Sequence, residues 1–82
     1  MQLDIITPDR NVFSGEATSV TFPGSGGQFQ VLNDHAPLVS TLARGPMTVV
    51  TAGRSQTFTV DGGVVEVLRN RVLVLAEAVL AA

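Results

Sequence analysis

The sequence contains no lysine, cysteine, tryptophan or tyrosine. The absence of cysteine excludes a disulfide, a thiol nucleophile and a cysteine metal cluster. The absence of lysine excludes a Schiff base, a P-loop lysine, and the attachment lysine of the small β-rich carrier domains for biotin or lipoate. The aromatic residues are four scattered phenylalanines, which do not form a platform for stacking nucleic-acid bases.

Charge is also scarce, because 15% of the 82 residues are charged against about 25% in typical soluble domains. Five arginines and seven acidic residues give a net charge of −2, so we expect no nucleic-acid partner. The length fits one domain over residues 1–82. No apolar run reaches the ~18 residues of a membrane span, and the start of the sequence does not resemble a secretory signal. We therefore expect an intracellular protein, or a mature chain, without a transmembrane segment.

Valine, threonine, isoleucine and phenylalanine dominate the short segments between turns, and these residues favour β-strands. Gly, Pro, Asn and Asp recur every few positions, a pattern typical of an all-β sandwich or barrel. The pattern predicts strands at 2–7, 11–14, 16–22, 28–32, 38–43, 46–52, 55–61, 64–69 and 71–76. Only the tail, residues 76–82, favours a helix, and it is too short to be a stable helix in isolation.

Several of these segments are apolar on both faces: Ile5-Ile6, Val49-Val50, Val64-Val65 and residues 72–75. A sandwich strand normally turns one face to water, so an apolar outer side needs cover. Neighbouring loops or the tail could supply that cover, or the excess is ordinary surface valine that needs none. Alternatively, the outer side is a docking surface, since contiguous exposed apolar patches usually mark partners. The residues leave both interpretations open.

The sequence shows little sign of catalytic chemistry. His35 is the only histidine, which excludes a two-histidine metal site, and we expect no metal and no cofactor. Asp34, His35 and Ser40 would form a hydrolase site only if they converged beside an oxyanion hole, and neighbouring Asp and His residues rarely do so. The glycine-rich segment 24–27 precedes a strand, whereas a phosphate-binding loop precedes a helix. A binding or assembly module is therefore the better interpretation.

Six short motifs follow one another in a fixed order along the chain. They are residues 3–8 (Leu-Asp-Ile-Ile-Thr-Pro), 12–15 (Val-Phe-Ser-Gly), Pro23-Gly24 with Gly27, 35–38 (His-Ala-Pro-Leu) with Leu42, 62–67 (Gly-Gly-Val-Val-Glu-Val) and 70–77 (Asn-Arg-Val-Leu-Val-Leu-Ala-Glu). In this order and spacing, the sequence resembles the epsilon subunit of F-type ATP synthases, across essentially its whole length.

The resemblance implies a β-sandwich of two roughly five-stranded sheets and a non-catalytic role. Such a domain sits in the rotating central stalk between the gamma subunit and the c-ring of the membrane sector. It couples the flow of protons or sodium ions to ATP synthesis, on the cytoplasmic face of the bacterial plasma membrane. No nucleotide is expected on this domain. The alternative is a stand-alone β-sandwich adaptor, and the lack of Trp and Tyr disfavours a sugar as its ligand.

The resemblance also implies two sets of contact residues. The set expected to contact gamma is Thr7, His35, Ser40 and Asp61. The set expected to contact the c-ring is Gln28, Asn33, Asp34 and His35.

Several of these positions depart from the family pattern. The family commonly has an acidic residue at the position of Gln28, Gly at that of Gln30, Pro-Gly at that of Asn33-Asp34, and Ser at that of Asp61. The ring loop often presents arginine, so with Gln28 neutral we expect Asp34 to supply the complementary charge.

Typical members of the family continue beyond this domain as a C-terminal helical hairpin, which in bacteria can inhibit ATP hydrolysis. The sequence ends at Ala82, where that hairpin would begin. We therefore expect no self-inhibition by helix insertion.

Overall fold

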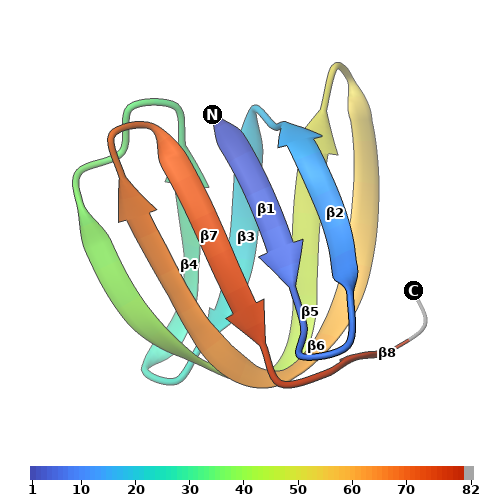
Figure 1. Cartoon of the computed structure of the whole chain (residues 1–82). Coiled ribbons are helices and arrows are strands. Elements are labelled where there is room, and N and C mark those ends of the chain that lie inside the picture. Colours follow the sequence, from blue (N-terminus) through green and yellow to red (C-terminus); the bar gives the residue numbers. More distant parts are fainter. Residues whose placement is uncertain (81–82) are drawn as a thin grey trace.

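The structure, a computed structural model, describes residues 1–80, and strands are the only regular secondary structure in that range (Figure 1). None of the described residues form a helix long enough to span a membrane. The strands are β1 (Gln2–Ile6), β2 (Asn11–Glu16), β3 (Ser19–Gly24), β4 (Gly27–Leu32), β5 (Leu38–Thr51), β6 (Arg54–Leu68), β7 (Arg71–Ala76) and β8 (Val79–Leu80). Two residues of the tail that favoured a helix, Val79 and Leu80, therefore form a short strand, while residues 81–82 lie outside the described part.

The strands form two packed layers joined by β5 and β6, which are long enough to run through both (Figure 1). Hydrogen bonds connect all strands in the order β2-β1-β7-β6-β5-β3-β4, with β8 also paired to β6. The first layer contains β2, β1, β7, residues 63–68 of β6 and residues 38–42 of β5. The second contains β8, residues 54–60 of β6, residues 45–51 of β5, β3 and β4. Five strand segments in each layer confirm the expected β-sandwich, although the hydrogen-bond network is one continuous sheet.

The corner between the layers differs from the sequence expectation. The sequence predicts breaks between 43 and 46 and between 61 and 64, yet the β5–β6 ladder continues through both, pairing Leu42 with Gly63 and Arg44 with Asp61. Gly62 has a φ of 81° and Gly63 a φ of 138°. Glycine adopts such angles without steric cost, so β6 bends into the other layer without losing its partner strand.

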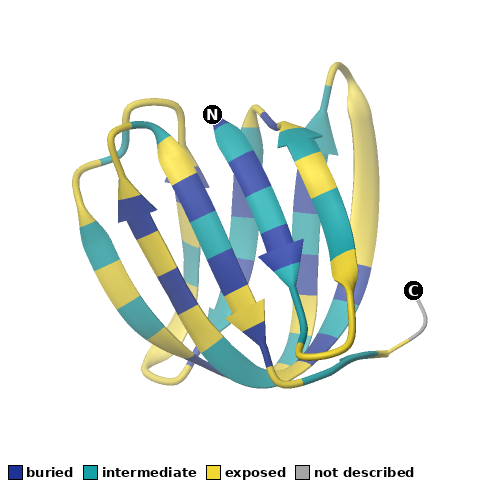
Figure 2. Cartoon of the chain, viewed as in Figure 1, coloured by how far each residue is buried: buried dark blue, intermediate teal, exposed yellow. Residues whose placement is uncertain are grey.

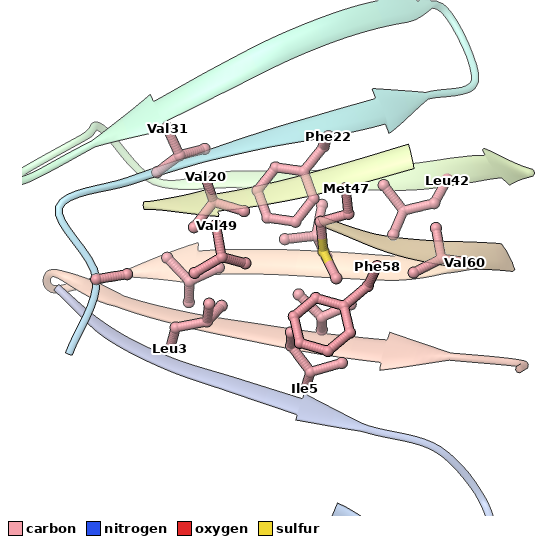
Figure 3. Packing of buried hydrophobic residues seen from close by; sticks show 14 of the residues in the cluster. Leu3, Ile5, Val20, Phe22, Val31, Leu42, Met47, Val49, Phe58 and Val60 are labelled. Carbon is pink, nitrogen blue, oxygen red and sulfur yellow. The ribbon is translucent and has the colours of Figure 1, made fainter. Parts of the chain in front are cut away.

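The core lies between the layers and follows the alternation along each strand. Figure 2 shows buried and less buried residues alternating along β1 and β7. Figure 3 shows Leu3, Phe22 and Met47 gathered between the strands, and all three have no exposed surface. The rings of Phe22 and Phe29 stack with their centres 5.3 Å apart. No polar side chain is fully buried among residues 1–80, so the interior is held by apolar packing.

Candidate docking surface

The outer side of the first layer carries apolar side chains on four neighbouring strands, β1, β7, β6 and β5. Residues that alternate with the core positions point outward, and paired residues on neighbouring strands lie side by side. Leu75 on β7 is paired with Ile6 on β1 and with Val64 on β6, which makes one apolar row across three strands. We call the outward-pointing apolar side chains of this layer the apolar face: Ile6, Val39, Val64, Leu68, Leu73 and Leu75. Asp4, Glu66 and Arg71 point to the same side.

Most of the apolar face is open to solvent. The exposed fraction is 68% for Val39, 50% for Leu75 and 48% for Leu68, and Leu73 is half-buried. The described tail residues Val79 and Leu80 do not cover it, because they pair with Thr59 and Val60 at the edge of the other layer. Nothing among residues 1–80 therefore covers the apolar outer side, which leaves a docking surface or ordinary surface apolar residues as the interpretations.

The outer side of the second layer is polar by comparison. Thr21, Thr48, Thr57 and Gln30 point outward there, alternating with buried core residues. The hydroxyl oxygens of Thr48 and Thr57 lie 3.4 Å apart on neighbouring strands. The outer side of the second layer is thus more polar than that of the first, although it also carries Leu32, which is 53% exposed, and Val50, both paired with Ser19.

Carboxylates flank the centre of the apolar face. Leu73 is paired with Asp4 on β1 and with Glu66 on β6, so two carboxylates stand on either side of one leucine. The Ser14 hydroxyl donates a hydrogen bond of 2.6 Å to Asp4 Oδ1, which fixes that carboxylate at the surface. A partner that fits this row presents an apolar side chain between basic groups.

Two hollows indent this side of the molecule. The first, of about 370 Å³, is lined by Ile6, Thr7, Pro8, Leu75, Ala76 and Glu77. The second, of about 380 Å³, is lined by Asp4, Glu66, Leu68, Arg69, Arg71, Val72 and Leu73. Both contain residues of the apolar face, so this surface offers depressions for protruding side chains of a partner.

The loop between β4 and β5, residues 33–37, lies at the end of the sandwich where β1 begins (Figure 1). Asn33 Oδ1 accepts a hydrogen bond of 2.5 Å from the backbone nitrogen of Met1. The backbone N–H of Asp34 donates to Asn70 Oδ1 at 2.8 Å. His35 N donates to the Leu32 carbonyl at 3.2 Å. Hydrogen bonds therefore connect the loop to the end of β4, to Met1 and to Asn70.

The structure separates the residues expected to contact gamma. Thr7 follows β1 and donates its backbone N–H to the Arg10 carbonyl at 2.9 Å, while Asp61 donates its own N–H to the Ala78 carbonyl at 3.0 Å. Both lie at the end of the sandwich opposite His35 (Figure 1). Ser40 is half-buried and alternates with exposed residues of β5.

The residues expected to contact the c-ring follow one edge of the second layer. Gln28 lies near the start of the edge strand β4, and Asn33, Asp34 and His35 follow its end. Asn33 lies five positions after Gln28, a distance of about 16 Å along an extended chain at the usual rise per residue. This set forms a strip rather than a single point.

The hydrolase interpretation finds no support in the described residues. His35 Nδ1 lies 2.7 Å from the Ala36 carbonyl oxygen, and the Ser40 hydroxyl donates to the Thr41 carbonyl at 3.0 Å. Neither side chain is hydrogen-bonded to the other or to the Asp34 carboxylate. No cluster of three or more possible metal ligands occurs among residues 1–80 either.

Comparison with known proteins identifies the family. The family described as "ATP synthase, Delta/Epsilon chain, beta-sandwich domain" matches residues 1–82. The chain belongs to this family. The ATP synthase epsilon chain of Chlorobaculum tepidum is 46% identical over 78 residues, which are 94% of this chain and 89% of that relative. The epsilon chain of Rhodopseudomonas palustris is 42% identical over 74 residues, 90% of this chain but 55% of the longer relative.

Solved structures support the same fold. A chain in the mitochondrial ATP synthase structure of Euglena gracilis (OSCP/F1/c-ring) matches with a TM-score of 0.89 and 22% identity, covering 95% of this chain and 51% of that one. A chain in the central stalk/c-ring structure of the Tetrahymena thermophila enzyme matches with a TM-score of 0.84 and 16% identity, covering 96% and 64%. The resemblance to the epsilon family is thus confirmed, and this membership agrees with a subunit that is not an enzyme by itself.

Sequence reasoning missed three residues of the site. Val39 and Leu68 complete the apolar face, and the alternation of exposed residues along β5 and β6 was the available signal for them. Asn70 entered the sequence analysis only as the first residue of the motif 70–77, although its side chain reaches the β4–β5 loop.

Proposed function

We propose that this epsilon-family domain is a rotor subunit of an F-type ATP synthase that docks the gamma subunit onto the c-ring. In this role it couples the flow of protons or sodium ions to ATP synthesis, at the cytoplasmic face of a bacterial membrane. Family membership supports the assembly, and the titles of the similar structures name the c-ring and the central stalk. The observation that carries the proposal is the uncovered apolar face.

We assign the apolar face to gamma. An exposed apolar face is typical of a subunit that stays bound to its partner, because burial of apolar surface is the main driving force of stable association. Thr7, one of the expected gamma contacts, lines the hollow that also contains Ile6 and Leu75. This position supports one gamma interface that runs from the apolar face to the β1–β2 turn.

We assign the edge strand β4 and the β4–β5 loop to the c-ring. Gln28, Asn33 and Asp34 are exposed along this strip, and their polar side chains suit the polar loops of a membrane rotor. The strip belongs to the second layer and the apolar face to the first. The two partners therefore bind different surfaces and do not compete.

Complementation of an ATP synthase that lacks its epsilon subunit tests this function. We expect the added chain to assemble with gamma and the c-ring and to restore ATP-driven ion pumping in membrane vesicles. Measurement with proton and sodium gradients identifies the coupling ion. A chain that folds but associates with neither gamma nor the ring contradicts the proposal and favours an adaptor for another protein.

A further inference from the structure

Asn70 joins three segments that are far apart in the sequence. It lies in the turn between β6 and β7, where Arg69 and Asn70 have φ values of 52° and 59°. Its side-chain oxygen accepts the hydrogen bond from Asp34 N at 2.8 Å. Its backbone carbonyl accepts another from Gln2 N at 3.1 Å. One half-buried residue thus links the turn, the start of β1 and the β4–β5 loop.

The β4–β5 loop needs such a link, because Asp34 is held in the left-handed region with a φ of 60°. A residue with a β-carbon adopts that conformation at a cost, which surrounding contacts have to offset. The Asp34 side chain is exposed, and its backbone N–H is the group that Asn70 fixes. The Asn70 amide therefore holds the backbone of the loop while leaving the Asp34 carboxylate at the surface.

We propose that Asn70 is a positioning residue that fixes Asp34 and the β4–β5 loop in the geometry needed to dock the c-ring. The inference rests on the proposed function for the identity of the partner. The turn of Asn70 connects two strands that carry Leu68 and Leu73 of the apolar face. The same residue therefore keeps the ring-facing loop in a fixed relation to the surface assigned to gamma.

Two substitutions separate the hydrogen bond from the backbone conformation. Asn70→Gly removes the side-chain acceptor, and glycine is well suited to the second central position of a turn with two positive φ values. Asn70→Asp keeps an acceptor oxygen at the same place and also tolerates this conformation. Both variants therefore fold, and they differ in whether Asp34 N has its partner.

Hydrogen exchange of the Asp34 amide in the full chain tests the positioning. We expect Asn70→Gly to accelerate that exchange by about fivefold or more, the loss of one hydrogen bond of ordinary strength. Exchange at the core residue Val65 serves as the internal control and stays unchanged. Exchange at Asp34 that matches the parent chain, or an equal increase at Val65, overturns the positioning role.

Association with the c-ring in the assembled rotor tests the consequence. We expect Asn70→Gly to weaken it by about fivefold, with Asn70→Asp restoring it at high salt, where the added charge is screened. Unchanged association of Asn70→Gly overturns the docking half of the inference, even if exchange at Asp34 increases. If the unmodified chain does not bind the c-ring, the proposed function is wrong, and so is the role of Asn70 in docking. The exchange measurement still decides whether Asn70 holds the Asp34 backbone.

Discussion

Gly63 lies so close to the carbonyl oxygen of Leu75 that a β-carbon at Gly63 would overlap that oxygen. The same β-carbon would stand 2.8 Å from the Cα of Ala76, which is also backbone. The contact joins the corner of β6 to the end of β7. The passage of β6 from one layer to the other therefore depends on a residue without a side chain.

We expect Gly63→Ala to lower the free energy of unfolding by about 2 kcal/mol or more. The new methyl group meets backbone atoms, which cannot move aside as a flexible side chain can, and the φ of 138° is strained for alanine. Urea denaturation of the two proteins measures the difference. Gly26→Ala is the control, because a β-carbon there meets nothing within 4 Å. Similar midpoints for both variants would contradict this account of the corner.

A pair of leucine substitutions distinguishes the core from the apolar face. Leu3 has no exposed surface and Leu75 is 50% exposed, although their strands are neighbours. Leu3→Ala is expected to cost about 2–5 kcal/mol of stability, because it leaves a cavity in the core. Leu75→Ala is expected to cost much less, since water already reaches that side chain. Chemical denaturation gives both values, and an equal loss would show that Leu75 belongs to the core.

The charge of Asp34 is expected to matter for docking rather than for folding. Its carboxylate is exposed, and the hydrogen bond that fixes the residue involves its backbone N–H. Asp34→Asn keeps the shape and a left-handed preference but removes the charge. We expect weaker association with the c-ring at low salt and a smaller salt dependence than in the parent chain. Association that is unchanged across a range of salt would rule out an electrostatic role for Asp34.

The sequence predicted the interior well because strand alternation is a local property. Val65 and Val67, and likewise Val72 and Val74, are buried while their neighbours are not. The corner was predicted less well. Gly and Asp usually end a strand, but at Asp61 the backbone bends and keeps its pairing with Arg44. Local composition indicates the bend, and only the partner strand determines that the ladder continues.

The site depended on contacts between distant residues, which the sequence does not display. The sequence shows which strands are apolar on both faces. It does not show that Val79 pairs with Val60 and so lies away from their outer side. Likewise, Asn70 is 36 residues from Asp34, and a turn signal does not indicate what its side chain reaches. The expected contact residues themselves, such as Thr7 and Gln28, remain predictions that binding experiments have to test.

Titration of gamma with two matched variants decides whether the apolar face is the surface that binds gamma. Leu75→Glu places a charge on the apolar face, and Thr57→Glu places the same charge on the polar outer side of the other layer. Both positions are exposed, so both variants are expected to fold. We expect Leu75→Glu to weaken gamma binding by about tenfold or more, the effect of placing an unpaired charge in an apolar contact. We expect Thr57→Glu to bind gamma like the parent chain. Equal affinities for the two variants, or a loss only with Thr57→Glu, would show that gamma does not bind the apolar face.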